Sequence, residues 1–535
     1  MPFTKPKKSD DDDNEAVDEQ PPTKTSHQED FNMFTFIGDI IVLLIIPTIL
    51  VSMFFKKKFS YWKERGVPQL EASIPFGNGP NPFKIRQPFF QIVKNYYDVF
   101  RSQGHKHGGI YITTKPVYMT IDPDYIKNVM SKDFQYFYDR GTYYNEKGDP
   151  LSAHLFNLEG QKWKSLRQKL TPTFTSGKMK MMFPTLLNCG NQMLDEINRL
   201  SSKQESIDIK EILGCYSTDV IGSCAFGLEC NSFKVPDAEF RMNGRNLFKP
   251  TFKRRLRIFL VANFPNICKR LGVVFIPKEV SNFFLNVVKE VIEYREKNHV
   301  HRNDFMQILM DMRNKDDEEM SIKQVAAQAF VFFIAGFETS ATTINFCLFE
   351  LAQNAEIQQK VRDEIEDVLQ DEEFTYDSVE KMKYLDQVID ETLRKYPPVP
   401  HLSRKCTTDY KIPGTNTVLE KNRRVYISIL GLHRDPEYYP DPEKFDPERF
   451  SSENKAKRHP FTFIPFGEGP RNCIGSRFGM MQTKVGLILL LRNFRVSLNE
   501  KTELPLVLEP SALLMTTRNK IWLDFDKVNH SVLQD

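Results

Sequence analysis

The sequence predicts a mainly α-helical fold with a small β portion, arranged as one large domain behind a single N-terminal membrane helix. Long helical patterns of apolar residues dominate from about residue 85 to 397. Two strand-like runs, GIYITT and KPVYMTI, stand early in this region, and after residue 397 Pro-rich chain alternates with short strands and one more long helix. The membrane helix is predicted from the apolar run Phe36 to Phe55.

The chain divides into four predicted segments. Residues 1–33 are acidic and almost free of apolar side chains, so they cannot offset the entropy cost of ordering and are expected to be disordered. Residues 34–55 are expected to form a transmembrane signal-anchor. Residues 56–84 read as a basic, Pro- and Gly-rich linker, and residues 85–535 as the domain that carries the function.

The apolar run favours a membrane anchor over its alternative, a cleaved signal peptide. No small-residue cleavage site follows the run. Three lysines, Lys56 to Lys58, follow it at once, and positive charge beside a membrane helix stays on the cytoplasmic side. The sequence therefore predicts a single-pass protein whose large domain faces the cytoplasm.

Composition narrows the class of partner. The 535 residues carry a net charge of +3, which is too mild to imply a nucleic-acid partner. Eight cysteines are scattered without a CxxC pair, so most are expected to be buried and reduced. Forty-three phenylalanines favour large apolar cavities or interfaces. These features indicate a globular protein in a reducing compartment.

The segment PFGEGPRNCIG, residues 465–475, places one cysteine among glycines and prolines. Such permissive backbone suits a Cys473 thiolate presented to a large, flat ligand. Gly467 and Gly469 allow a sharp turn close to the ligand, and amides freed by that turn can point at the sulfur. Phe466 is expected to shield the sulfur, and Arg471 to reach a carboxylate of the ligand. Gly475 would let the next helix pack close to the ligand.

A second motif, AGFETS, lies inside a helix expected from Ser321 to Asn354. Ser321 and Gln324 have the capping-box pattern that marks a helix start, and the residues that follow are apolar on nearly all faces. The acid–alcohol pair Glu338 and Thr339 is costly in a buried helix unless it is used. The simpler alternative is that Thr339 only bonds back to the carbonyl one turn earlier.

Two weaker patterns occur in other helices. Glu391 and Arg394, in ETLR, have the i,i+3 spacing of an ordinary surface ion pair, and Arg449 stands in a later PERF sequence. Trp163 and Arg167, in WKSLR, share one helical face, for which simple helix packing is the default interpretation. Each pattern alone is weak evidence for a functional site. The order of all the motifs along the chain makes the evidence stronger.

Together these motifs resemble those of the cytochrome P-450 superfamily, over roughly residues 34 to 527. Finer details are most like microsomal insect members that metabolise xenobiotics. The resemblance implies that Cys473 is the axial iron ligand of a haem b group. It implies that haem propionates accept hydrogen bonds from Trp163, Arg167 and Arg404. Arg471 would add a further positive charge for these carboxylates.

The resemblance also assigns roles away from the cysteine. Glu391, Arg394 and Arg449 would form a buried network that supports the cysteine loop. Glu338 and Thr339 would relay protons while oxygen is activated. The implied activity is an NADPH- and O₂-dependent monooxygenase that inserts one oxygen atom into lipophilic small molecules, plant toxins or insecticides among them.

The implied electron donors are an NADPH-dependent flavoprotein reductase and, optionally, cytochrome b5, and the implied location is the endoplasmic reticulum membrane. Two other functional classes compete with this interpretation. A haem-thiolate isomerase needs no reductase, but such enzymes tend to lose the acid–alcohol pair. A haem sensor or carrier would need neither a proton relay nor an apolar pocket.

The sequence leaves the substrate open. Pocket walls are expected from the stretch after Phe134, the helix face of residues 330–337, residues 399–400 and residues 511–514. The mixed basic and apolar segment Arg254 to Pro277 is expected to dip into the cytoplasmic leaflet and to admit lipophilic substrates. An ordinary pair of core helices is the alternative for this segment.

Overall fold

The structure is a computed structural model that describes residues 26–249, 251–315, 320–370 and 372–528. The described chain divides into two compact units, which meet between Lys58 and Phe59. The first contains helix α1 (Ser26–Lys58). This helix begins inside the predicted acidic extension and ends inside the predicted linker, while residues 1–25 of that extension lie outside the described residues.

Most of the predicted linker belongs to the second unit. Trp62 is fully buried, and its indole Nε1 donates to the backbone oxygen of Ile110 in strand β1 (His107–Ile112) at 3.1 Å. Gly109 leaves room for the ring, because a Cβ there would lie 2.2 Å from Trp62 Cγ. The predicted domain start at residue 85 is therefore too late, since a buried tryptophan holds the preceding chain on the domain.

Helices form most of the second unit, and the mainly helical fold predicted from the sequence is confirmed. They are α2 (Phe89–Ser102), α3 (Pro123–Lys127), α4 (Gly160–Leu170), α5 (Ser176–Ser201), α6 (Ile209–Ile221), α7 (Glu239–Phe248), α8 (Phe252–Asn263), α9 (Pro265–Arg270), α10 (Lys278–Asn298), α11 (Phe305–Lys315), α12 (Ile322–Gln353), α13 (Ala355–Gln370), α14 (Tyr376–Val379), α15 (Lys383–Lys395), α16 (Ile429–His433), α17 (Ser452–Lys457) and α18 (Ser476–Asn493).

The strands of the described chain form three small sheets. The largest has the order β1, β2 (Lys115–Thr120), β7 (Arg424–Ser428) and β4 (His401–Lys405), with β2 and β7 parallel and the other neighbours antiparallel. A second joins β3 (Ile207–Asp208), β9 (Trp522–Lys527) and β8 (Phe494–Leu498). The third pairs β5 (Tyr410–Lys411) with β6 (Val418–Leu419).

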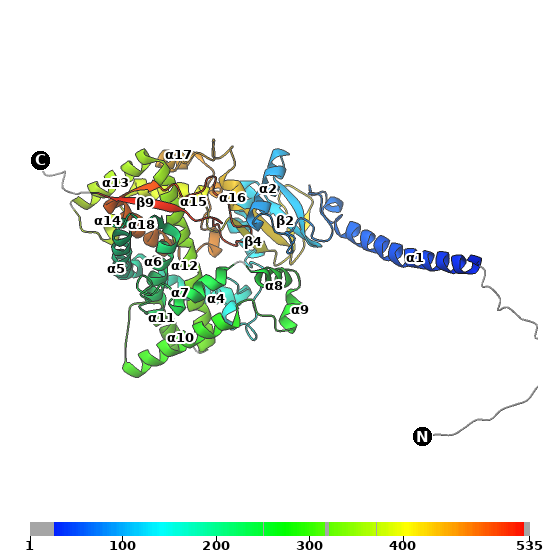
Figure 1. The fold of residues 1–535 in the computed structure, drawn as a ribbon, viewed down its shortest axis with the longest axis horizontal. Helices are drawn as coiled ribbons and strands as arrows, with labels where there is room; N and C mark the ends of the chain where they lie inside the picture. Colours follow the sequence, from blue (N-terminus) through cyan, green and yellow to red (C-terminus); the bar gives the residue numbers. More distant parts are fainter. Residues whose placement is uncertain (1–25, 250, 316–319, 371, 529–535) are drawn as a thin grey trace, which may run out of the picture. The chain divides into compact units, whose positions relative to one another are not determined.

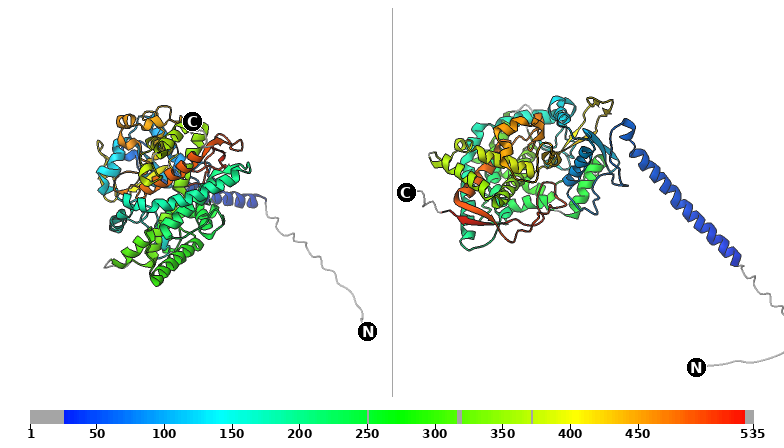
Figure 2. Two further views of the ribbon diagram at one scale, coloured as in Figure 1. Left: turned by 90° about the vertical axis from the view of Figure 1, so that its left-hand side faces the viewer. Right: turned by 90° about the horizontal axis from the view of Figure 1, so that it is seen from above.

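Figure 1 shows how these elements divide the second unit. The largest sheet, α2 and α16 occupy one side of the second unit, and α5, α6 and α13 occupy the opposite side. The right-hand view in Figure 2 keeps this division, with the first strands in blue and the C-terminal strands in red well apart.

Helix α12 is the central element of the second unit. Ser321 forms the predicted capping box with Gln324, and α12 packs against α6, α10 and α18. It crosses α6 so closely that a Cβ on Gly336 would lie 2.3 Å from Ile221 Cδ1. Among the described residues α12 is the one helix long and apolar enough to cross a membrane, but 61% of its most apolar window is buried in the protein. It is therefore a core helix.

Candidate functional site

A cavity opens where α4, α12, residues 398–404 and the loop before α18 meet, and Cys473 lines it. Of the eight cysteines, all in the described part of the chain, Cys473 alone has an exposed side chain. The others are buried or half-buried, and burial raises the pKa of three of them, Cys189, Cys347 and Cys406, to about 12. The structure thus singles out the cysteine that the sequence motif predicts.

The loop that carries Cys473 depends on its glycines. Gly467 and Gly469 have φ angles of 69° and 71°, a left-handed conformation that side chains rarely adopt. A Cβ on Gly469 would also lie 1.9 Å from the backbone oxygen of Met130. The backbone N–H of Cys473 donates to the backbone oxygen of Phe466 at 2.8 Å and closes the loop. This closure places the sulfur at the cavity.

Some features around Cys473 raise the pKa of its thiol, and others lower it. The Cys473 side chain is exposed to the cavity but lies below the protein surface, and this removal from bulk water raises the pKa of Cys473, whereas a hydrogen bond from the backbone N–H of Gly475 lowers it. The guanidinium groups of Arg140 and Arg167 lower this pKa as well. Burial prevails, so a thiolate here needs a further positive partner, and a bound metal ion supplies one.

Four arginines form a cluster in the wall of the cavity. Arg140, Arg167, Arg404 and Arg471 all line it. Burial, followed by the charge of a neighbouring guanidinium group, lowers the pKa of Arg404 and of Arg471 to about 9. Asp139 approaches this cluster at 4.0 Å from Arg471 Nη2.

Several donors in the cluster are left without an acceptor. The Nε atoms of Arg140, Arg404 and Arg471 are buried and have no hydrogen-bond partner among the described residues. A buried donor without a partner is costly, and so is a group of like charges in a cavity. The arrangement is therefore complementary to a ligand that carries carboxylates.

Trp163 and Arg167 lie on one face of α4, as their spacing predicts. The guanidinium carbon of Arg471 lies 4.1 Å from the centre of the Trp163 ring. Arg167 donates to the backbone oxygen of Asn472 at 2.9 Å and to its side-chain oxygen at 2.7 Å. Both residues thus contact the cysteine loop as well as the cavity, which simple helix packing does not require.

Sequence reasoning did not find Arg140. Its Nη2 donates to the backbone oxygen of Arg471 at 3.0 Å, and its guanidinium lies 3.9 Å from the centre of the Phe156 ring. Burial, and next the charge of Arg404, lowers its pKa well below the usual value. The residue stands in an irregular segment without a motif. The one feature of the sequence that could have indicated a role for Arg140 is its position in the stretch after Phe134, where a pocket wall is predicted.

One face of α12 forms the cavity wall. The residues on it follow a spacing of three and one: Gln328, Val331, Phe332, Ala335, Gly336, Thr339, Ser340 and Thr343. Thr339 Oγ1 donates to the backbone oxygen of Ala335 at 2.5 Å, which is the back-bond of the simpler alternative. Because Thr339 also lines the cavity, the back-bond and a role in the cavity occur together.

Glu338 does not join Thr339 at the cavity. Its side chain is 15% exposed, and its Oε1 lies 3.4 Å from Nζ of Lys210 on α6. The residues of α12 that line the cavity include Ala335, Gly336, Thr339 and Ser340 but not Glu338, so Glu338 points away from the cavity face. The structure therefore places Thr339 at the cavity and Glu338 behind it, and the proton relay predicted for the two residues is taken up as a proposal below.

The remaining walls are apolar. Phe305 and Phe332 stack with ring centres 4.1 Å apart, and Phe174 lies 5.1 Å from Phe332. Pro398 and Val399 line the cavity, in partial agreement with the predicted wall at residues 399–400. Residues 511–514, another predicted wall, are not among the lining residues.

The predicted network of Glu391, Arg394 and Arg449 is present and buried. Arg394 Nε donates to Glu391 Oε2 at 2.6 Å, and Arg394 Nη2 donates to Oε1 at 2.8 Å. Arg449 Nε lies 3.5 Å from the same Oε1. Both side chains of the i,i+3 pair are fully shielded from solvent, which excludes the surface-pair interpretation.

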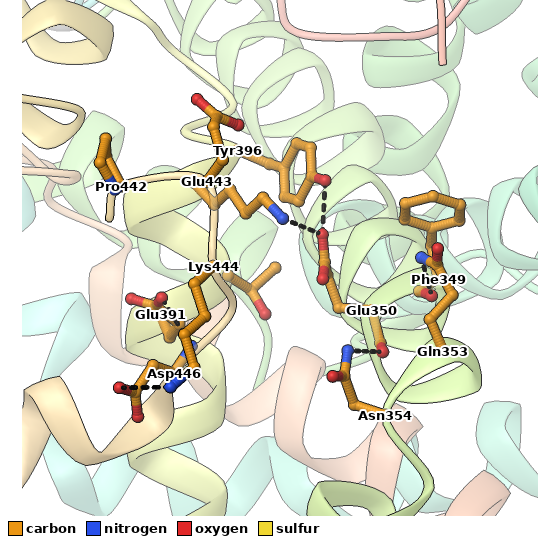
Figure 3. Close-up of polar contacts among 12 residues, drawn as sticks. Phe349, Glu350, Gln353, Asn354, Glu391, Tyr396, Pro442, Glu443, Lys444 and Asp446 are labelled. Atoms are coloured by element: carbon orange, nitrogen blue, oxygen red, sulfur yellow. Dashed lines mark hydrogen bonds and ion pairs between the residues drawn. The ribbon is translucent and has the colours of Figure 1, made fainter. Parts of the chain in front are cut away.

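Figure 3 shows Glu391 of this network together with a second buried carboxylate, Glu350. The backbone N–H of Asp446 donates to Glu391 Oε1 at 2.9 Å. Arg394 Nη2 also donates to the backbone oxygen of Pro442 at 2.8 Å. In the other site Glu350 of α12 accepts from the Tyr396 hydroxyl at 2.5 Å and from Lys395 at 2.8 Å. Both sites fix the chain that leads from α15 into the cavity wall.

The cytochrome P450 family model matches residues 73–523, which include all of these motifs. The chain belongs to the cytochrome P450 family. Cytochrome P450 6a2 of Drosophila melanogaster is 42% identical over 504 residues, which cover 91% of this chain and 99% of that protein. Cytochrome P450 6A1 of Musca domestica is 40% identical over 494 residues, or 90% of this chain and 97% of that protein. The chain is thus a haem-thiolate monooxygenase similar to insect members of the family.

The residues of this cytochrome P450 fit the haem that its family implies. Cys473 offers a sulfur to the cavity, and the buried donors of the arginine cluster match the two propionates. The stacked phenylalanines match the apolar edge of the ring. The roles of these residues are taken up as proposals below.

We predict that Arg394→Ala lowers the free energy of unfolding by about 3 to 5 kcal/mol, because Glu391 would stay buried without its partner. Chemical denaturation followed by circular dichroism measures this change. The matched control is Arg199→Ala, which breaks an i,i+3 Glu–Arg pair on the surface of α5. Equal effects of the two substitutions would contradict the prediction.

Proposed function

We propose that this cytochrome P450 uses O₂ and electrons from NADPH to insert one oxygen atom into lipophilic small molecules, xenobiotics such as plant toxins or insecticides among them. The observation that carries this proposal is the place of Cys473. It is the one cysteine exposed to a largely apolar cavity in the described chain, and Thr339 lines the same cavity. Haem b, when bound to the Cys473 thiolate, supplies the chemistry that activates oxygen.

The chain's own residues then have distinct tasks. Cys473 binds the iron through its sulfur, and Gly475 keeps the sulfur oriented through its N–H. Arg140, Arg404 and Arg471 bind the propionates with donors that otherwise lack acceptors. The apolar walls exclude water and hold a lipophilic substrate near the sulfur-bearing loop.

Proton supply is divided between two faces of α12. Thr339 holds a proton at Oγ1 on the cavity face, where its donor bond to Ala335 can be exchanged for a bond into the cavity. Glu338 lies on another face beside Lys210 and is partly exposed, so it can exchange protons with solvent. In this proposal Glu338 supplies protons and Thr339 delivers them.

The alternatives remain distinguishable. A haem-thiolate isomerase would turn over peroxides without a reductase, and it would not depend on the Thr339 hydroxyl. A haem sensor or carrier would bind its ligand without consuming NADPH. Incubation with reductase, NADPH and a panel of lipophilic compounds, followed by mass spectrometry, separates these classes by the products formed.

We also propose that the protein is a single-pass protein of the endoplasmic reticulum membrane with its catalytic domain in the cytoplasm. Apolar side chains of α1 from Ile41 to Phe54 are largely exposed, which supports a membrane environment for this helix. The basic run Lys56 to Lys58 ends α1 and supports a cytoplasmic orientation of that end.

The segment of residues 254–277 supports a second contact with the membrane. Phe264, Ile267 and Leu271 are exposed on α9 and just beyond it, next to the exposed residues Lys269 and Arg270. This mixture suits an interfacial position. Phe259 and Leu260 of α8 are half-buried, and the Phe259 ring centre lies 6.0 Å from that of Phe76. These two residues therefore pack within the protein more than Phe264, Ile267 and Leu271 do.

The proposed electron donors are an NADPH-dependent flavoprotein reductase and, optionally, cytochrome b5. Lys164 and Lys169 are exposed on the outer face of α4, whose inner face contacts the cysteine loop through Arg167. A negatively charged partner docked on this face would lie one helix away from Cys473.

Replacing Cys473 with His should abolish oxygenation and remove the thiolate-type Soret band of the reduced carbon-monoxide complex, because imidazole donates less electron density than a thiolate. Absorption spectroscopy of the purified protein measures this. The control is Cys406→Ser, since Cys406 lies outside the cavity lining. A thiolate-type band that persists in Cys473→His would show that another residue is the ligand.

Replacing Thr339 with Ala should leave haem binding intact but separate NADPH use from product formation, because no proton is held at the cavity face. Product per NADPH should fall and peroxide should rise. Thr343→Ala, one turn further on the same face, is the matched control and should be less affected. Tight coupling of NADPH to product in Thr339→Ala would count against the proposed proton delivery.

Replacing Phe264, Ile267 and Leu271 with Ser should weaken membrane binding of a form that lacks residues 1–58, because exposed apolar area would be lost. Flotation with phospholipid vesicles measures this. The KM for lipid-soluble substrates should rise more than kcat falls. A control variant replaces three exposed apolar residues elsewhere, Val235, Tyr294 and Val418, with Ser. Equal partitioning of both variants would refute the membrane contact.

A further inference from the structure

His433 is a buried histidine that neither the sequence motifs nor the proposed mechanism uses. It is the last residue of α16 and is fully shielded from solvent. Its ring centre lies 5.2 Å from that of Phe463, and the Phe463 ring centre lies 4.5 Å from that of Phe450 in the PERF sequence. The imidazole therefore sits between the buried network and the chain that leads into the cysteine loop.

The backbone and the side chain of His433 each accept one hydrogen bond, from two different segments of the chain. Its backbone oxygen accepts from Arg394 Nη1 at 3.0 Å. Its ring Nε2 accepts from the backbone N–H of Ile464 at 3.0 Å. Ile464 is itself fully buried, so no water is available to replace this acceptor.

Ile464 is the residue at which the cysteine loop begins. Its backbone oxygen accepts from the N–H of Gly467 at 2.9 Å, and Phe466 closes the loop by accepting from the N–H of Cys473. The backbone N–H of Ile464 is therefore hydrogen-bonded to His433, and its backbone oxygen is hydrogen-bonded to the cysteine loop. A displacement of Ile464 would move the turn that presents the sulfur.

The protonation state of the imidazole agrees with this geometry. An imidazole nitrogen accepts a hydrogen bond only when it carries no proton. Burial, and next the charge of Arg394, lowers the pKa of His433 to about 3, while the nearby backbone of Leu393 and Arg394 acts in the opposite direction. The ring is thus neutral under ordinary conditions, with Nε2 available as an acceptor.

We propose that His433 is a positioning residue for Cys473, through which the Glu391–Arg394 pair sets the place of the cysteine loop. The inference rests on the haem site proposed above and adds a residue to it. His433 does not touch the iron or the substrate. It acts through Ile464, in the way that residues behind a metal ligand orient that ligand.

The test compares His433→Phe with His433→Gln in the full-length, haem-loaded protein. Phenylalanine keeps the ring contact with Phe463 but removes the acceptor, whereas the glutamine side-chain oxygen can accept from Ile464. The two readouts are the thiolate-type Soret band of the reduced carbon-monoxide complex and the rate of haem transfer to excess apomyoglobin. We expect His433→Phe to lose part of that band and to release haem about 10- to 100-fold faster, and His433→Gln to stay near the wild type.

His401→Phe is the matched control. His401 is a histidine of β4 whose ring packs on Phe89 and Tyr426, away from Ile464. Thermal unfolding of each variant separates general destabilisation from a displaced loop. A His433→Phe protein that unfolds earlier but keeps the wild-type band and haem release would overturn the inference. So would a His433→Gln protein as impaired as His433→Phe. Absence of the thiolate-type band from the wild type itself would instead overturn the proposed haem site, and this inference with it.

Discussion

The ion pair between Glu391 and Arg394 is closed off from water, and four residues from later parts of the chain contact it. Arg394 donates to the backbone oxygens of His433 and Pro442, and Glu391 accepts from Asp446 and faces Arg449. None of these partners belongs to a regular sheet or a long helix. A segment without its own ladder of hydrogen bonds needs fixed external partners, and this pair provides them. The irregular chain between α16 and α18, which contains the cysteine loop, is built on that support.

The cavity combines two environments that rarely occur side by side. Part of the lining is made of stacked phenylalanines, and another part holds Arg140, Arg404 and Arg471 with donors that lack acceptors. Exclusion of water makes this unpaired charge more costly, so the tight packing of the surrounding helices has to offset that cost in the folded protein. Such a cavity is complementary to an amphipathic ring that carries its carboxylates on one edge, which is the shape of haem.

How much could be predicted from the sequence depended on whether the signal was local. The capping box at Ser321, the glycines around Cys473 and the strands at residues 107–120 follow from neighbouring residues, and they were predictable. Glu391, Arg394 and Arg449 were predicted by resemblance to the family, since the spacing alone suggested a surface pair. Arg140 and His433 were not found, because each acts through partners more than thirty residues away that no local pattern encodes. The burial of Trp62 escaped notice for the same reason.

The face that α12 turns to the cavity carries small residues at its centre. Gly336 has no space for even a methyl group against Ile221, and Ala335 and Thr339 stand beside it. This part of the helix cannot easily accept larger side chains. Val331, one turn before Ala335 on α12, and Val399 and Leu402, which follow α15, line the same cavity and take no part in its charge clusters. Substitutions at these three positions can therefore change the shape of the cavity while the close packing at the centre of the helix is kept.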